Sequence, residues 1–216
     1  MVITIDGPAG SGKSTVARKL ANRLGFIHLN SGALFRAVGI SASKQGIPLD
    51  DDFAVQKVAR ELTFLFSLDE QKNTVFLVDG KNISREISEE HVGKLASQVA
   101  LLPSVREELL NIQRQASKKH SLVVEGRDSG TVVFPDAEKK FYLDAGLDVR
   151  AKRRQGEFGE LHSLEEVKKQ IESRDLQDST RKIAPQIVPP GATVIDTSEL
   201  GVDDVIERMF QEVSIG

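Results

Sequence analysis

The feature that most constrains the fold is a glycine-rich segment near the N-terminus, Gly7-Pro8-Ala9-Gly10-Ser11-Gly12-Lys13-Ser14. The short β-branched run Val2–Ile5 precedes it, and from Lys13 to Gly25 the apolar residues recur with helical period. A strand, a loop of this composition and a helix, in that order, predict a phosphate-binding P-loop. Its glycines let backbone N–H groups close around phosphates, and the helix N-terminus adds partial positive charge.

The P-loop residues have separate expected parts in binding Mg-ATP. Lys13 should reach the β- and γ-phosphates, Ser14 should offer its hydroxyl to Mg²⁺, and Thr15 should contact the α-phosphate. The rest of the loop should cradle the phosphates through its backbone, and it consists of Gly7, Pro8, Ala9, Gly10, Ser11 and Gly12. A glycine-rich turn that binds nothing is the alternative, but the flanking strand and helix argue against it.

Short apolar runs alternate with helical patterns along the chain. Such alternation predicts an α/β fold with a parallel sheet and helices on both faces. The five runs are Val2–Ile5, Phe26–Asn30, Leu122–Gly126, Phe141–Ala145 and Ala192–Thr197. Helices are expected at about 32–44, 89–100, 103–119 and 202–213, and Gln155–His162 is expected to be a loop.

One segment departs from this alternation. Thr63–Leu68 and Val75–Val78 read as adjacent strands, and Asp79-Gly80 is typical of a tight hairpin turn. We therefore expect a small antiparallel β insert between about residues 62 and 88.

Composition excludes several classes of function. Lys and Arg number 29 against 32 Asp and Glu, so the chain lacks the basic excess typical of proteins that bind nucleic acid. It contains no cysteine, which excludes disulfides and thiolate chemistry. No apolar run approaches the ~20 residues that span a bilayer. We expect a cytoplasmic monomer that binds neither nucleic acid nor membrane.

Arginines recur at positions that suit an acceptor carrying phosphate. Arg174, Asp178 and Arg181 are spaced to share one helix face, although a solvated, salt-bridged face has the same spacing. Two phosphates must approach to bonding distance in phosphoryl transfer, and guanidinium groups offset their repulsion. An ionised phosphate oxygen attacks without a general base, since its second pKa lies near 6.

With these segments, the chain resembles the bacterial cytidylate kinase family over nearly its whole length. The resemblance rests on Ile3–Pro8 with the P-loop, Ser31–Arg36, Ala96–Ala100, Val105–Glu107, Gly126–Ala137, Arg174–Arg181 and Ala184-Pro185. It implies a five-stranded P-loop sheet, an ATP and Mg²⁺ requirement, and CMP and dCMP as acceptors. It also implies a core (about 1–31, 101–148 and 182–216), a nucleoside-monophosphate (NMP) region holding the β insert (about 32–100), and a short lid (about 149–181).

The resemblance further assigns roles to individual residues. Ser97, Arg106 and Asp128 would form the cytosine pocket, where a carboxylate accepts from the exocyclic amino group. Ser31, Arg36, Arg127 and Arg181 would hold the acceptor phosphate, and Arg174 and Asp178 would face the ribose. Arg153, in the lid, would bind ATP. The residues that act on the transferring phosphoryl group would be Lys13, Arg127, Arg150, Arg154 and Arg181.

Residue-level alternatives and departures remain. Ser97 could face solvent, Arg106 could pair with Glu107, and Asp128 could be a turn former. Asn30 and Glu125 stand where the family often has Asp, so we expect Glu125 to reach the metal through water at most. Two other functions remain open: a P-loop kinase acting on a small hydroxyl acceptor, and an ATP-binding switch module.

Overall fold

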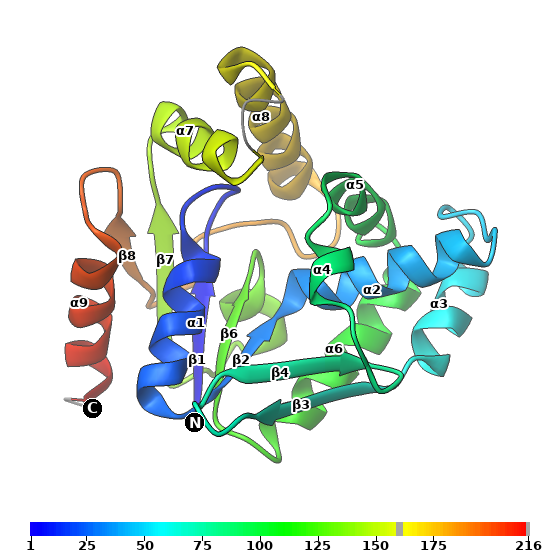
Figure 1. The fold of residues 1–216 in the computed structure, drawn as a ribbon, viewed down its shortest axis with the longest axis horizontal. Helices are drawn as coiled ribbons and strands as arrows, with labels where there is room; N and C mark the ends of the chain where they lie inside the picture. The colour runs from blue at the N-terminus through cyan, green and yellow to red at the C-terminus, as the bar shows by residue number, and fades with distance from the viewer. Residues whose placement is uncertain (159–161, 215–216) are drawn as a thin grey trace.

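The computed structural model describes residues 1–158 and 162–214. A five-stranded sheet forms its centre, with every neighbouring pair of strands parallel. In sheet order the strands are β2 (Ile27–Asn30), β6 (Leu122–Gly126), β1 (Val2–Asp6), β7 (Lys139–Asp144) and β8 (Thr193–Asp196). The expected five-stranded parallel sheet is confirmed, and its carboxyl ends meet at one edge (Figure 1).

Helices cover both faces of this sheet. On one face α1 (Lys13–Leu24) and α9 (Val202–Ser214) bury Ile3, Ile5 and Phe141. The other face carries a larger core around Leu29, Leu122 and Val124. It is formed by α2 (Ser31–Lys44), α3 (Asp52–Glu61), α5 (Glu90–Val99) and α6 (Pro103–Ser117). Within the described ranges, no helix is long and apolar enough to cross a membrane.

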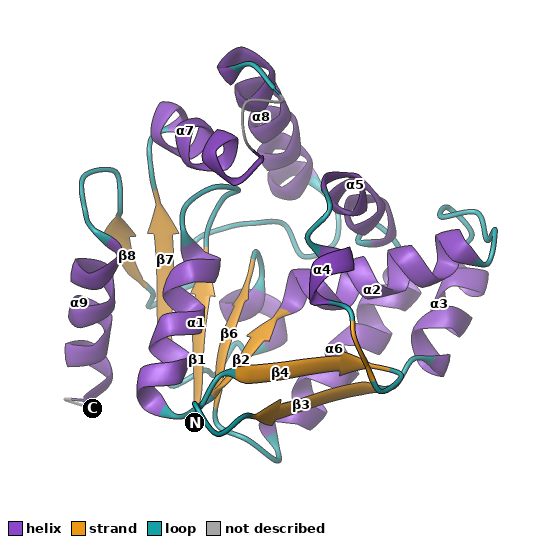
Figure 2. Ribbon diagram, in the orientation of Figure 1, coloured by secondary structure: helices purple, strands orange, loops and turns teal. Residues whose placement is uncertain are grey.

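The expected antiparallel insert is present as a separate sheet, whose strands cross the direction of the central ones (Figure 2). It consists of β3 (Phe64–Leu68), β4 (Thr74–Val78) and β5 (Lys81–Asn82), and the short helix α4 (Ser84–Ile87) follows. Asp79 and Gly80 both have positive φ, as a tight hairpin turn requires. They join β4 to β5, a two-residue strand that the sequence pattern did not reveal.

Two helices pack above the P-loop. Apolar side chains of α7 (Leu147–Phe158) and α8 (Leu164–Thr180) form a small cluster with Ala9 of the loop. The expected loop over Gln155–His162 is wrong for its first part, because α7 continues to Phe158; residues 159–161 lie outside the described part. One glycine costs a helix only about 1 kcal/mol relative to alanine, so Gly156 does not end α7.

Close packing of α2 against α5 generates a test of the fold. A Cβ added at Gly39 would lie 2.9 Å from the Cβ of Leu95, on the helix that carries Ser97. Gly39→Ala should therefore lower the free energy of unfolding by about 1–3 kcal/mol through overpacking, measured by urea denaturation. Gly156→Ala is the matched control, since its Cβ would meet no atom of the described part of the chain within 4 Å. Equal stability of the two variants would contradict the close packing.

Candidate active site

The P-loop lies between β1 and α1, at the carboxyl edge of the central sheet. Gly10 and Gly12 have φ of 77° and 85°, and Gly12 is the N-cap of α1. A Cβ at Gly7 would lie 2.1 Å from the carbonyl oxygen of Leu143 on β7, which leaves room only for glycine. The loop and its helix N-terminus therefore have the geometry of an anion site.

Lys13 is buried and points back across this loop. Its Nζ donates to the carbonyl oxygen of Pro8 at 2.8 Å. Burial, followed by the positive charge of Arg127, holds the pKa of Lys13 well below its ordinary value. Phosphate oxygens bound at the loop would supply negative charge that stabilises the charged form of the Lys13 ammonium group.

Ser14 is joined to Glu125, a buried carboxylate that the sequence predicts to reach the metal through water at most. The Ser14 hydroxyl donates to Glu125 Oε2 at 2.6 Å, and His28 Nε2 lies 2.9 Å from Glu125 Oε1. Burial opposes ionisation of Glu125, but the bonds from His28 and Ser14 outweigh it and hold its pKa below the ordinary value. A hydroxyl and an ionised carboxylate are the oxygen ligands that Mg²⁺ prefers, so this pair fits the metal.

The expected base-binding residues come partly together. Arg106 is ion-paired with Asp128, and Arg181 Nη2 lies 3.2 Å from Asp128 Oδ1. The Arg106 guanidinium also lies 5.5 Å from the centre of the Phe35 ring. Asp128 makes no side-chain cap bond to the helical turn that follows it. The Asp128 carboxylate is therefore directed at Arg106 and Arg181. A turn-forming role is not needed to explain Asp128, and a pair with Glu107 is not needed to explain Arg106.

Ser97 is oriented differently from its neighbours in this group. Its hydroxyl donates to the carbonyl oxygen of Gly93, one turn back in α5, at 3.0 Å. Its own carbonyl oxygen accepts from Gln177 Nε2 on α8 at 3.2 Å. A serine hydroxyl rotates easily, so the contact with Gly93 leaves Ser97 available to a ligand.

Several arginines lie in the region between the P-loop and α5, and they come from α2, from α8 with its C-cap, and from the segment after β6. Arg127 Nε donates to Asp178 at 3.0 Å, and Arg181 Nη1 lies 3.5 Å from the same carboxyl group. Arg36 Nη1 donates to the Ile87 carbonyl oxygen at 2.6 Å. Burial, and then the charge of Arg127, lowers the pKa of Arg174 to about 10. Ser31 is buried at the start of α2 and lies beside Gly126. A Cβ added at Gly126 would be 3.5 Å from the Cβ of Ser31.

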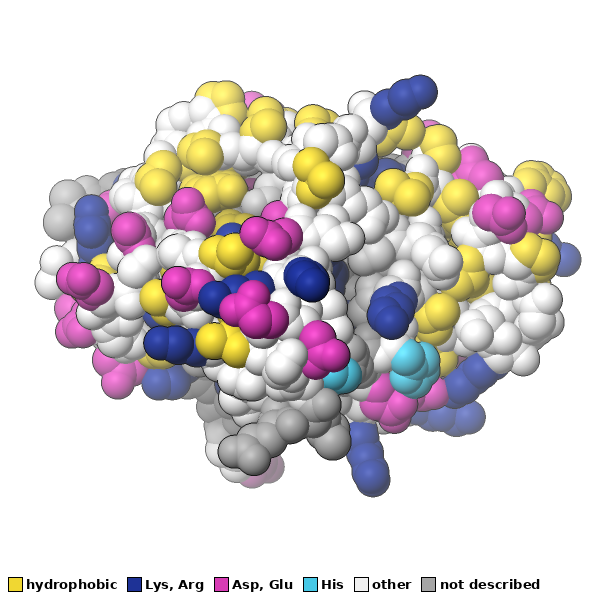
Figure 3. Space-filling model, turned by 90° about the horizontal axis from the view of Figure 1, so that it is seen from above, with side chains coloured by type: hydrophobic (Ala, Val, Ile, Leu, Met, Phe, Trp, Pro, Cys, Tyr) yellow, Lys and Arg dark blue, Asp and Glu magenta, His cyan; other side chains and the backbone are white. Residues whose placement is uncertain are grey.

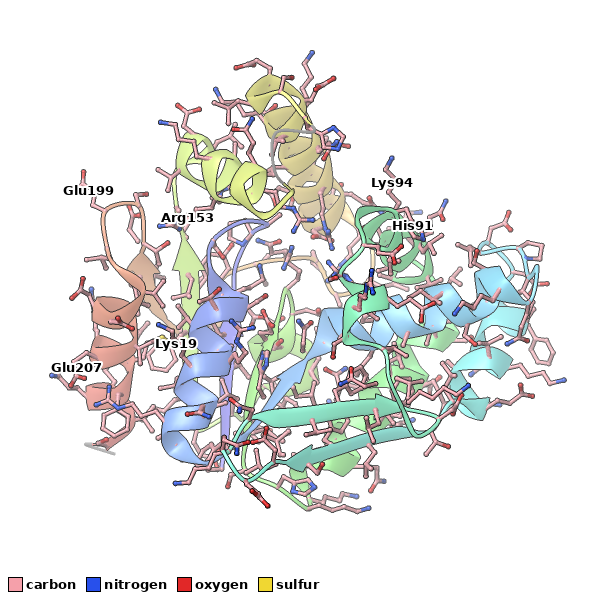
Figure 4. All side chains as sticks on the ribbon, viewed as in Figure 1. Lys19, His91, Lys94, Arg153, Glu199 and Glu207 are labelled. Carbon is pink, nitrogen blue, oxygen red and sulfur yellow. The ribbon has the colours of Figure 1, made fainter. Side chains whose placement is uncertain are left out.

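The three arginines of α7 have different surroundings. Arg150 donates to the carbonyl oxygens of Ala145 (2.9 Å) and Ala9 (3.0 Å). Arg153 lies beside the loop that follows β8, where it donates to the carbonyl and hydroxyl oxygens of Thr197 at 2.6 and 3.0 Å (Figure 4). Arg154 is near enough to Arg174 to contribute to lowering its pKa. On the end of the molecule seen from above, basic and acidic side chains lie side by side (Figure 3).

Two carboxylates at the site were missed from the sequence. Asp175, next to Arg174, accepts from the Ala9 backbone N–H at 3.1 Å and is ion-paired with Arg150. Asp6 ends β1 and accepts from two backbone N–H groups beyond β6. Asp175 directly follows an assigned arginine in the sequence, and Asp6 directly precedes the P-loop. Adjacency was the available signal, but the backbone N–H groups that these two carboxylates bind lie more than 100 residues away in the chain.

A hollow on the surface lies away from this site. It has a volume of about 540 Å³ and is lined mainly by α1 and α9. The ion pairs on its walls, Lys19–Asp203 at 3.0 Å and Arg23–Glu207 at 2.7 Å, are exposed to solvent. Lys19 and Glu207 lie away from the P-loop end of α1 (Figure 4). We therefore place the candidate site at the P-loop and the arginines facing it.

Comparison with known proteins agrees with this geometry. The sequence profile of the cytidylate kinase family matches residues 3–215. This chain belongs to the cytidylate kinase family. It is 43% identical to the cytidylate kinase of Geobacter sp. (strain M21), over 99% of this chain and 92% of that one. It is 44% identical to the cytidylate kinase of Bdellovibrio bacteriovorus, over 99% of this chain and 97% of that one. The resemblance inferred from the motifs is confirmed.

Solved structures support the P-loop kinase fold. Shikimate kinase from Bacteroides thetaiotaomicron gives a TM-score of 0.51 at 11% identity, covering 99% of this chain and 98% of that one. TT1252 from Thermus thermophilus gives 0.53 at 20% identity, covering 100% and 96%. Likeness at such identities concerns the fold and leaves the acceptor to be argued from this family member's own site.

The lowered pKa of Lys13 generates a test by calorimetry. Bound phosphates would raise this pKa, so the complex holds more protons than the free protein at a pH between the two values. ATP binding at about pH 8, where its phosphates are already ionised, should take up at most about one proton. Affinity should accordingly fall as pH rises toward the ordinary pKa of lysine. Titrations in buffers of different ionisation enthalpy measure the uptake.

Lys13→Met is the control for this titration, run at ATP concentrations that still saturate the variant. It should bind ATP without the proton uptake. Equal uptake in both proteins would assign the proton to another group and contradict the argument for Lys13.

Proposed function

We propose that this chain transfers the γ-phosphoryl group of ATP to CMP and dCMP, giving ADP and CDP or dCDP. The observation that carries the proposal is membership of the cytidylate kinase family over residues 3–215, and the charges of Lys13, Arg127 and Arg174 at the P-loop agree with it. Arg127 depresses the pKa of both other groups, second only to burial. Buried like charges are costly unless a ligand neutralises them, and here one comes from the P-loop and two from the opposite side. Two phosphates that meet between them would balance that charge.

The P-loop side would hold ATP. Loop N–H groups and the α1 N-terminus bind the phosphates, Thr15 contacts the α-phosphate, and Lys13 leaves the Pro8 carbonyl oxygen for the β- and γ-phosphates. Ser14 and Glu125 would hold Mg²⁺, which when bound neutralises charge that develops on the phosphate oxygens. His28 orients the Glu125 carboxylate through the bond at 2.9 Å.

The opposite side would hold the acceptor phosphate. Arg36, Arg127 and Arg181, with Ser31, orient its oxygens in line with the bond between the γ- and β-phosphates. An ionised oxygen of CMP attacks the γ-phosphorus, the bond to the bridging oxygen breaks, and ADP leaves with that electron pair. No proton has to be removed from the attacking oxygen, which fits a site whose carboxylates are held by arginines. Asp178 and Arg174 face the ribose.

Cytosine would be read by Asp128, Arg106 and Ser97. The exocyclic amino group donates to Asp128, and Arg106 donates to the ring acceptors. Uracil would place a carbonyl oxygen against the Asp128 carboxylate and be rejected. Since Arg106 and Asp128 are already paired, the base would take a place beside an existing ion pair. The pocket is thus preorganised for a ligand with both donor and acceptor groups.

The lid, about residues 149–181, would close over ATP and exclude water. Arg150 already contacts the P-loop through Ala9 and is anchored by Asp175. Arg154, whose positive charge contributes to lowering the pKa of Arg174, would act with Arg150 on the transferring phosphoryl group. Arg153 lies against Thr197, which donates to the P-loop carbonyl oxygen of Ser11 at 3.2 Å. It would bind ATP from that side, and the chain would work as a monomer.

The proposal is tested by ADP release with Mg-ATP and CMP, dCMP, UMP, AMP, GMP, dTMP or no acceptor. We expect strong turnover with CMP and dCMP, and loss by orders of magnitude in Lys13→Ala. Turnover with another monophosphate would refute the cytosine pocket. Hydrolysis without an acceptor would favour a switch module, and turnover with shikimate or a sugar acid would favour a hydroxyl kinase.

Asp128→Asn tests the base pocket on its own. The carboxamide replaces an acceptor by a donor, so KM for CMP should rise about tenfold or more, and UMP should be discriminated against less. Steady-state kinetics with both acceptors give the measurement. Asp136→Asn, an exposed residue of the same connection, should leave both values unchanged. Unaltered kinetics in Asp128→Asn would place Asp128 outside the pocket.

A further inference from the structure

Asp6 is a fully buried carboxylate in the central strand of the sheet, immediately before the P-loop. Its Oδ1 accepts from the Ser129 backbone N–H at 2.8 Å, and its Oδ2 accepts from the Gly130 backbone N–H at 2.7 Å. Both oxygens are thereby committed to one segment more than 120 residues away in the chain. Neither of these two bonds involves a residue of the P-loop.

The segment that Asp6 holds is a single π-helical turn, η1 (Ser129–Val133). Such turns are rare and recur at functional sites, since their wide backbone ring is poorly stabilised without outside support. The wide ring is closed by Val133 N–H to Asp128 O at 3.2 Å and by Phe134 N–H to Ser129 O at 2.7 Å. The first N–H groups of a helical turn have no partner within it, and here Asp6 accepts two of them.

Packing leaves this turn little room to shift. A Cβ at Gly130 would lie 2.8 Å from the Thr4 hydroxyl oxygen and 2.9 Å from Pro189 Cγ. A Cβ at Gly126 would lie 2.4 Å from the Ser129 hydroxyl oxygen. The backbone of η1 therefore lies directly on β1, close enough for two of its N–H groups to donate to the Asp6 carboxylate.

Asp128, the proposed base reader, is the residue immediately before η1. Its φ of −138° and ψ of 20° depart from both helix and strand, so its backbone conformation depends on what holds the next residues. Its side chain makes no cap bond to η1 and instead meets Arg106 and Arg181. Burial, chiefly, together with the nearby charge of Asp128 raises the pKa of Asp6 despite its two backbone bonds.

We propose that Asp6 is a positioning residue for base selection, which fixes η1 and thereby the aim of the Asp128 carboxylate. The inference rests on the proposed function, since it concerns the same pocket. It also gives a physical link between the two substrate sites: the residue that holds the base-reading segment is joined by one peptide bond to Gly7, the first residue of the P-loop.

A merely structural Asp6 would affect stability without affecting selectivity, and kinetics separate the two roles. Asp6→Asn keeps the shape of the side chain but turns an N–H donor toward one of the two backbone donors. We expect KM for CMP to rise about 10-fold and the preference for CMP over UMP in kcat/KM to fall by about as much. The Kd for ATP, measured without acceptor, should stay within about twofold, because the P-loop contacts remain.

Thr4→Val is the matched control. Thr4 lies on the same strand two residues earlier, is equally buried and touches the same turn, yet its hydroxyl has no hydrogen-bond partner among the described residues. This variant should keep the CMP preference of the wild type. If Asp6→Asn lowers only the melting temperature and keeps that preference, or if Thr4→Val loses it equally, the positioning role is overturned.

Wild-type hydrogen exchange provides a measurement that does not depend on the folding of a variant. CMP should slow exchange of the Ser129 and Gly130 amides by about 10-fold relative to the free protein, because binding at Asp128 stabilises the turn that Asp6 holds. Exchange at these amides that ignores CMP, in a protein that phosphorylates CMP, would overturn the inference. A wild type that fails to phosphorylate CMP would instead refute the proposed function.

Discussion

The repulsion between buried cations at the carboxyl edge of the sheet is the constraint around which the rest of the site is arranged. Lys13 projects from the start of α1, Arg127 follows β6, and Arg174 lies on α8. Each of these elements brings one positive charge toward a common point. Carboxylates balance part of this charge: Glu125 near Lys13, and Asp178 beside Arg127. The positive charge that is left over is what a site for two phosphates requires.

The same carboxylates give the site its rigidity. Glu125, Asp128, Asp175 and Asp178 each contact at least two groups from different parts of the chain. A side chain held from two directions loses its entropy during folding and not during substrate binding, which favours tight and selective binding. The long residue Glu125 illustrates this. It spans from β6 to the P-loop hydroxyl of Ser14 while also meeting His28 on β2.

Contacts between α8 and the rest of the molecule explain how donor and acceptor sides would act together. Asp175 faces the P-loop, whereas Asp178 and Gln177 face Arg127 and α5. One helix therefore touches both substrate sides within a single turn. Movement of α8 would change both at once, which is a physical basis for cleaving the bond between the β- and γ-phosphates of ATP only when an acceptor is present.

The sequence by itself determined the parallel sheet, the P-loop and the family, because these depend on local residue spacing: a strand, a glycine-rich loop and a helix within 25 residues, and five apolar runs. It also predicted the antiparallel insert. Only the tertiary structure decided which carboxylate each arginine meets, that Arg150 is anchored to the P-loop, that α7 continues past Gly156, and that Asp6 holds η1. Those outcomes depend on contacts between residues far apart in the chain. No local pattern encodes them, since a carboxylate next to a motif can pair with any cation that the fold brings within reach.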